Sequence, residues 1–260
     1  MRSAVQLIAL LAALGLAAVG ARADEKVIAG LSQHSVSLTT NFSGSQLFVY
    51  GAVQRVREPA DGEKLDVIVT ITGPSAPVEV RRKERQYGIW INGRGVRVDR
   101  APSFYAVATT GPFREILSHT DELRHRIGLD HVIQLIAPPE WAKDAREDYR
   151  RAVARIRETE GLYSIRPNTV SLTENTLFET RIKLPADLTE GDYVARIFLL
   201  RDKAVLDVFE ETIEVRRAGI GQLIYSSAQD YPALYGLASI LIALAAGWLA
   251  SAFFRTFFPN

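Results

Sequence analysis

The chain has 260 residues, of which 47% are hydrophobic and 23% are charged, and its formal net charge is +1. This composition excludes a disordered chain and a multi-span transporter. The absence of cysteine excludes disulfides, thiolate nucleophiles and cysteine-ligated metal sites. The small net charge excludes a protein that binds nucleic acid by neutralising phosphates, so no nucleic acid is expected as a partner.

The first 23 residues have the pattern of a secretory signal peptide. Arg2 supplies a positive start, residues 4–20 form an uncharged run rich in Leu and Ala, and the small residues at 21 and 23 fit cleavage before Asp24. An uncleaved anchor is the alternative, although the run is short for a membrane span. Cleavage leaves 29 basic and 30 acidic residues, so the mature chain has a net charge of −1.

Residues 24–111 form a first block of predicted strands, in which β-branched and aromatic residues alternate with polar ones. Asn92 and Gly93 both tolerate positive φ and lie between two apolar runs, so this pair predicts a tight hairpin turn. Strands at this spacing indicate immunoglobulin-like antiparallel β-sandwich units. The expected strands are 35–39, 46–54, 65–71, 78–85, 88–91, 96–100 and 103–109.

Residues 112–161 form a central helical segment inserted between strands. A short helix is expected over 112–117, and a second helix from an N-cap at Thr120 to a stop at Gly128. A longer helix is expected from near Pro139 to Gly161, with charges on one face that are either a solvated surface or a binding surface. Its apolar face consists of Trp141, Ala145, Tyr149, Ala152 and Ile156.

The same segment contains the only clustered histidines, His119, His125 and His131, with acidic residues between them. A spacing of six places successive histidines on different sides of a helix, which disfavours convergence on one metal ion. Surface and capping roles, with no metal and no cofactor, are therefore expected. A metal-binding or enzymatic site in the 119–131 region is the alternative.

Residues 162–217 return to a strand pattern, with the clearest strands at 177–184, 193–201 and 205–215. The segment 184–193 resembles the corner that precedes a late strand of immunoglobulin-like sandwiches, and Tyr193 would bond to the backbone upstream. An ordinary half-buried strand tyrosine is the alternative.

A weak internal repeat relates residues 36–41 to residues 170–175. The repeat is compatible with two duplicated sandwich units and equally with two strand blocks that pair in one sandwich. The second block is short for an independent domain.

Residues 231–254 contain no charge and predict a transmembrane helix of about 36 Å, with aromatic residues at both ends. A buried core helix is the alternative. Residues 218–230 are a juxtamembrane segment and 255–260 a cytoplasmic tail. A cleaved signal peptide places the body in the periplasm; Arg255 agrees with the positive-inside rule, whereas Arg216 and Arg217 oppose it.

A stripe of small residues follows the predicted span at intervals of four: Ser239, Ala243, Gly247 and Ser251. Small side chains allow a second helix to approach closely inside a bilayer, so we expect a membrane-protein partner or self-association along this stripe. The alternative is ordinary lipid-facing composition.

No phosphate-binding glycine loop, nucleophile elbow or His-Glu-x-x-His motif occurs in the sequence, so a non-enzymatic function is expected. Several short motifs together carry a resemblance to one family. They are Arg82-Lys83, the segments 88–92 and 102–108, Leu184-Pro185-Ala186, Gly191-Asp192-Tyr193, Tyr235-Gly236 and Gly247-Trp248-Leu249.

In this order the motifs resemble the alphaproteobacterial transmembrane family Alph_Pro_TM, over nearly the whole mature chain. The resemblance implies a single-span envelope protein, and it implies association with sulfite-exporter-like permeases. It carries over no catalytic residue, because none is assigned in the family. The expectation is therefore a single-pass inner-membrane protein that serves as an accessory or interaction subunit, with a membrane-tethered enzyme or metal-binding protein as the alternative.

Overall fold

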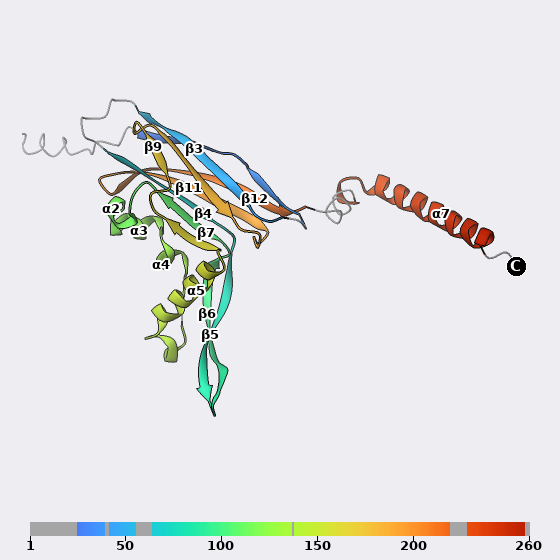
Figure 1. Cartoon of the computed structure of the whole chain (residues 1–260), viewed down its shortest axis with the longest axis horizontal. Coiled ribbons are helices and arrows are strands. Elements are labelled where there is room, and N and C mark those ends of the chain that lie inside the picture. Colours follow the sequence, from blue (N-terminus) through green and yellow to red (C-terminus); the bar gives the residue numbers. More distant parts are fainter. Residues whose placement is uncertain (1–24, 40–41, 56–63, 137, 219–227, 258–260) are drawn as a thin grey trace, which may run out of the picture.

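The computed structural model describes residues 25–39, 42–55, 64–136, 138–218 and 228–257 (Figure 1). The predicted signal peptide lies outside the described residues, as do residues 219–227 of the juxtamembrane segment and 258–260 of the tail. The predicted class is confirmed: a mainly β body with a helical insertion, followed by one apolar C-terminal helix.

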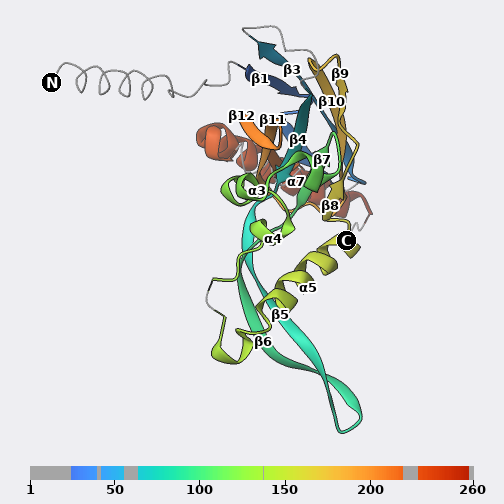
Figure 2. The same cartoon turned by 90° about the vertical axis from the view of Figure 1, so that its left-hand side faces the viewer.

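Two β-sheets that enclose a common core form the body (Figures 1 and 2). The first sheet has the order β1 (Glu25–Leu31), β3 (Ser45–Arg55), β10 (Leu177–Leu184) and β9 (Ser171–Thr173). The second has the order β2 (Ser35–Leu38), β12 (Ala204–Arg217), β11 (Gly191–Arg201), β4 (Leu65–Thr72), β7 (Tyr105–Thr109) and β8 (Tyr163–Arg166).

The two strand blocks of the sequence share both sheets. Strand β10 of the second block pairs antiparallel with β3 of the first, and β11 pairs antiparallel with β4. The structure therefore contains one sandwich built from both blocks, and not two duplicated units. A few strands from the second block alone could not enclose a core, because each sheet buries its apolar face only against the other sheet.

Strand β1 was not expected from the sequence, yet Val27 and Leu31 on it are buried in the shared core. Its short run carries two charged residues and two small ones, which weakens the alternation on which strand prediction depends. Pairing with β3 along its whole length supplies the backbone hydrogen bonds of this strand.

The helical segment covers the outer face of the six-stranded sheet and encloses a second core. Strand β4 is accordingly buried on both faces, and Ile68 faces the helices while Val69 faces the other sheet. The covering elements are α2 (Phe113–Ile116), α3 (His119–His125), α4 (Leu129–Val132), the 3₁₀ turn η1 (Glu140–Ala142) and α5 (Arg146–Thr159).

The helix ends differ from those predicted. The N-cap of α3 is Ser118, whose hydroxyl accepts a hydrogen bond from the Asp121 amide at 3.2 Å, and not Thr120. Helix α3 ends at Arg126 in the left-handed region, whereas Gly128 precedes α4. The long helix begins at Arg146, because η1 takes up the residues after Pro139 separately.

A long ribbon of two strands, β5 (Ser75–Gln86) and β6 (Ile89–Pro102), leaves the sandwich (Figures 1 and 2). Its turn is formed by Tyr87 and Gly88, both with positive φ. The predicted turn at Asn92 and Gly93 is wrong, since both residues lie inside β6. There the pairing shifts between Arg81 and Lys83, so the Asn-Gly pair adjoins a bulge.

The register of the ribbon explains this difference. Val78 lies opposite Val98 and Val80 opposite Val96, which places all four side chains on one face, against the helical segment. A turn at residues 92 and 93 would shift this pairing and move valines to the solvent face. Burial therefore overrides the local preference of Asn-Gly for a turn.

Tyr193 lies at the base of this ribbon, with its ring buried 6.1 Å from the Phe104 ring. Its hydroxyl donates a hydrogen bond of 2.8 Å to the carbonyl oxygen of Thr189, four residues upstream. This is the bond expected of a tyrosine corner. A Cβ at Gly73 would lie 2.8 Å from the Tyr193 ring, so the start of the ribbon packs directly on the tyrosine.

We expect Tyr193→Phe to lower the free energy of unfolding by about 1 kcal/mol, because it removes one sequestered hydrogen bond and leaves the Thr189 carbonyl without it. Urea titrations of the purified chain measure this value. Tyr50→Phe is the matched control, since Tyr50 is exposed and its hydroxyl has no hydrogen bond among the described residues. Equal midpoints for the two variants would refute a stabilising corner.

Candidate interaction surfaces

Helix α7 (Pro232–Phe257) is long and apolar enough to cross a membrane. Residues Pro232–Ser251 have a mean hydropathy of 1.9, and none of this window is buried inside the structure. At 1.5 Å per residue the whole helix measures about 39 Å, which exceeds a hydrocarbon core of about 30 Å. It is the one such helix in the described part of the chain.

The four small residues Ser239, Ala243, Gly247 and Ser251 all lie exposed on α7. The hydroxyl of Ser239 donates a hydrogen bond of 2.8 Å to the Tyr235 carbonyl of the preceding turn. Ser239 is therefore satisfied within its own helix. A Cβ at Gly247 would meet no atom within 4 Å, so a larger residue there would encounter only lipid or another chain.

Two of the three histidines of the 119–131 region come together: the ring centroids of His119 and His131 are 6.5 Å apart, whereas His125 lies elsewhere. Glu122 lies between His119 and His131, at 3.5 Å and 3.3 Å from their ring nitrogens. His125 instead lies 5.6 Å from the Phe198 ring, where desolvation lowers its pKa. Among the described residues, no group of three or more potential ligands is arranged to hold a metal ion.

Asp121 in the same region is buried and is fully used within the fold. One carboxylate oxygen accepts from the Val205 amide at 3.1 Å, and the other pairs with Arg124 at 3.0 Å. The carboxylate therefore joins α3 to the start of β12. These contacts give Asp121 a structural role.

We expect Asp121→Ala to destabilise the chain by about 1–3 kcal/mol, because the partly buried Val205 amide loses its acceptor and the buried carboxylate is removed. Asp130→Ala is the control, since the Asp130 carboxylate is exposed and forms no ion pair among the described residues; it should change stability by less than about 0.5 kcal/mol. Thermal melts of both variants test this assignment. Comparable melting temperatures would show that the Asp121 contacts are dispensable.

The β5–β6 ribbon is the most exposed part of the folded body. Residues 81–90 are all exposed, and the ribbon extends past the helical segment (Figure 2). Its end carries Tyr87, Ile89 and Trp90, with 104%, 64% and 68% of their surfaces exposed. An isolated two-stranded ribbon is at best marginally stable in water, so large apolar side chains at its end indicate a contact surface.

A groove of about 820 Å³ lies between β5 and α5. Its apolar lining consists of Val80, Ala145, Tyr149, Ala152 and Ile156. Its charged lining consists of Arg81, Arg82, Lys83, Arg151 and Arg155, with Asp148 as the one acidic residue. Arg81 pairs with Glu79 and Arg151 with Asp148, which leaves three cations of the groove without an ion pair among the described residues. These three cations, Arg82, Lys83 and Arg155, beside an apolar floor suit an anionic amphipathic ligand or segment.

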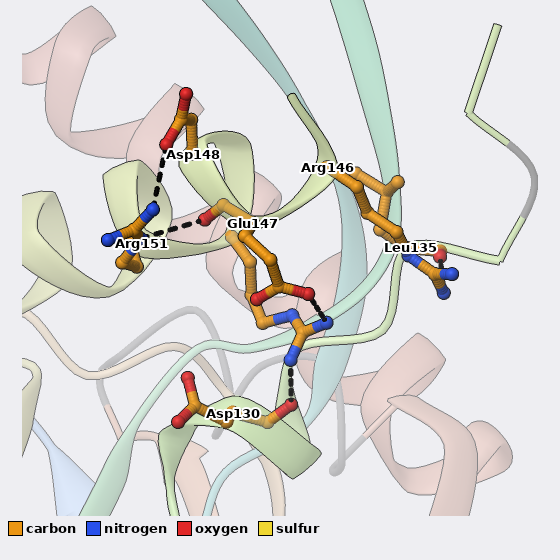
Figure 3. A network of polar contacts seen from close by, with 7 residues as sticks. Asp130, Leu135, Arg146, Glu147, Asp148 and Arg151 are labelled. Carbon is orange, nitrogen blue, oxygen red and sulfur yellow. Dashed lines mark hydrogen bonds and ion pairs between the residues drawn. The ribbon is translucent and has the colours of Figure 1, made fainter. Parts of the chain in front are cut away.

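A polar network at the start of α5 fixes this helix beside the ribbon (Figure 3). The Arg146 guanidinium donates to the Leu135 carbonyl, and Arg150 donates to the Asp130 carbonyl at 2.7 Å and to Glu147 at 2.6 Å. Arg151 binds Asp148 at 2.8 Å. The arginines of α5 therefore have two roles. Arg146 and Arg150 join the helix to the preceding segment, whereas Arg151 and Arg155 line the groove.

The groove was not predicted from the sequence. Basic residues on α5 and the Arg82-Lys83 motif were each visible, but they lie far apart in the chain. The prediction of a turn at residues 92 and 93 also placed the end of the hairpin at the wrong residues, so it did not show that Tyr87 and Gly88 form the exposed end of the ribbon.

Two comparisons with known proteins bear on the whole chain. The family model described as "Putative transmembrane protein (Alph_Pro_TM)" matches residues 26–256, which include the sandwich, the helical segment and the apolar helix. No curated protein matches the chain.

Proposed function

This chain belongs to the Alph_Pro_TM family of transmembrane proteins, and on this premise we propose that it is a non-enzymatic interaction subunit of the bacterial inner membrane. Its body lies in the periplasm, α7 spans the bilayer once, and its C-terminus is cytoplasmic. The signal-peptide pattern and Arg255 support this orientation. The hydrogen bond of Tyr193 supports an immunoglobulin-like relationship of the sandwich.

The groove between β5 and α5 is the observation that carries this proposal. Its cations lie on two elements that are distant in sequence, and its apolar floor would otherwise remain open to water. We assign it an acidic, partly apolar segment of a membrane-protein partner. The resemblance of the sequence motifs suggests a sulfite-exporter-like permease as the class of partner.

The 119–131 region lends less support to a tethered enzyme or a metal-binding protein. Asp121 and Glu122 already contact groups of the same chain, and His125 packs against an aromatic ring. Metal analysis of the purified full-length chain tests this alternative directly, and stoichiometric metal that is lost in His131→Ala would favour it.

We expect a photo-crosslinking amino acid at Ile156, which lines the groove and is about half exposed, to capture a membrane protein in intact membranes. Combining it with Lys83→Glu and Arg155→Glu should reduce the captured product by about tenfold, because like charges would then face an acidic segment. Neither cation forms an ion pair among the described residues, so the fold should persist.

The same crosslinker at Ala204 is the control, because this exposed residue lies at the opposite end of the sandwich from the ribbon. Identical products from positions 156 and 204, unaffected by the charge reversals, would rule out the groove as the binding site.

We expect Gly247→Leu to weaken association along α7 while leaving membrane insertion intact. Close packing of two helices needs small side chains on the touching face, and leucine is favourable for insertion. Among the described residues, no atom lies within 4 Å of a Cβ built at Gly247, so the fold does not oppose the larger side chain. Co-purification with the partner or with a second tagged copy measures the effect, and Leu244→Val is the control. If Gly247→Leu associates as strongly as the wild type, the small residues of the stripe face lipid and do not form a helix contact.

A further inference from the structure

We propose that the end of the β5–β6 ribbon, residues 82–94, is a second membrane contact that seats on the anionic phospholipid surface of the bilayer spanned by α7. This contact goes beyond the proposed function because it requires no protein partner; it shares only Arg82 and Lys83 with the groove. Three independent features of the described residues support it.

The first feature is the apolar end of the ribbon. Tyr87, Ile89 and Trp90 occupy the turn and the first residues of β6, and no other part of the described chain covers them. Tyrosine and tryptophan favour the boundary between headgroups and hydrocarbon. The last ladder pairs, Gln86 with Ile89 and Arg85 with Trp90, satisfy the backbone groups that face the partner strand. The groups on the outer edges of this two-stranded ribbon need water or lipid headgroups, so the ribbon contacts the bilayer at headgroup level.

The second feature is charge. Residues 82–94 contain four basic residues, Arg82, Lys83, Arg85 and Arg94, and one acidic residue, Glu84. None of the four cations forms an ion pair among the described residues. The net charge of this short segment is +3, although the mature chain as a whole has a net charge of −1. Unpaired cations directly behind an aromatic end complement the phosphates of an anionic bilayer.

The third feature is position. The ribbon starts just after Thr72, the last residue of β4. Thr72 pairs with Val194 of β11, close to the end of the sheet where Gly191 of β11 lies opposite Val215 of β12. A Cβ at Gly191 would lie 2.9 Å from the Pro74 ring. The ribbon and the chain that continues to α7 therefore leave the sandwich at the same end.

The lengths are compatible with one bilayer. Strand β5 has 12 residues and measures about 40 Å. The 14 residues between Arg217 and Pro232 can span at most about 50 Å. A membrane reached by α7 is thus within reach of the ribbon. An aromatic end with cations behind it matches the layers of a bilayer surface, and this order favours lipid over an acidic protein surface.

The absence of cysteine permits a direct test on the full-length chain. Gln86→Cys places a single thiol beside the turn and keeps Tyr87, Ile89 and Trp90. The variant is labelled with an environment-sensitive nitrobenzoxadiazole dye and reconstituted into vesicles of phosphatidylglycerol and phosphatidylethanolamine. We expect a blue-shifted emission that brominated lipids quench, and a loss of most of this shift in pure phosphatidylcholine vesicles.

Ala204→Cys, at the far end of the sandwich, is the matched control and should remain water-like in both vesicles. Combining Gln86→Cys with Arg82→Gln, Lys83→Gln and Arg85→Gln should abolish the shift. Tyr87→Ser with Trp90→Ser should do the same. All five substituted side chains are exposed, so circular dichroism should be unchanged.

Two results would overturn the proposal. One is a dye at position 86 that stays water-like in anionic vesicles while the variant remains folded. The other is a shift that is independent of lipid charge and rises with protein density, or that needs an added membrane protein, since the ribbon would then bind a second copy or a partner.

Discussion

Burial of the central strands on both faces is the constraint on which the rest of this structure depends. Strands β4 and β11 lie side by side, with Val69 and Ile197 facing the four-stranded sheet and Ile68 and Phe198 facing the helical segment. The helical insertion covers the apolar part of the outer face of the six-stranded sheet, and this part lies mainly on β4, β7, β8 and β11. The insertion is therefore a structural layer, and its removal would expose these apolar residues.

This layer also creates the surfaces to which we assign function. Helix α5 contacts β5, β6 and β8, and its first turn is held by hydrogen bonds to carbonyl groups of preceding segments (Figure 3). The groove exists because α5 covers only the part of the ribbon nearest the sandwich. Arg81, Arg82 and Lys83 line the groove opposite α5, and beyond them the side chains of the ribbon are exposed.

The base of the ribbon links the sandwich to the membrane-directed end of the chain. Tyr193 packs on Gly73 and Phe104, and Gly191 packs on Pro74, so the start of the ribbon and the start of β11 are held together. Because β11 pairs with β12, the ribbon is rigidly related to the strand that leads to α7. The proposed groove and the ribbon thus belong to the same folded unit as the strand from which the chain continues toward α7.

The sequence by itself determined the features that depend on local composition and period. An uncharged run of 24 residues is typical of an apolar helix, and it identified the helix that is long and apolar enough to cross a membrane. Alternation and helical spacing identified the β class and the central helices, and Tyr193 was singled out from its local corner motif. Family membership followed from short motifs along the chain.

Only the tertiary structure decided the features that depend on residues distant in sequence. The pairing of β3 with β10 joined the two strand blocks into one sandwich, which their internal resemblance could not decide. Burial of Val80 and Val96 placed the hairpin turn at Tyr87 and Gly88 despite the stronger local signal of Asn92 and Gly93. The groove joins cations about 70 residues apart. Each of these features arises from burial across the fold, and no local pattern records which surfaces will meet.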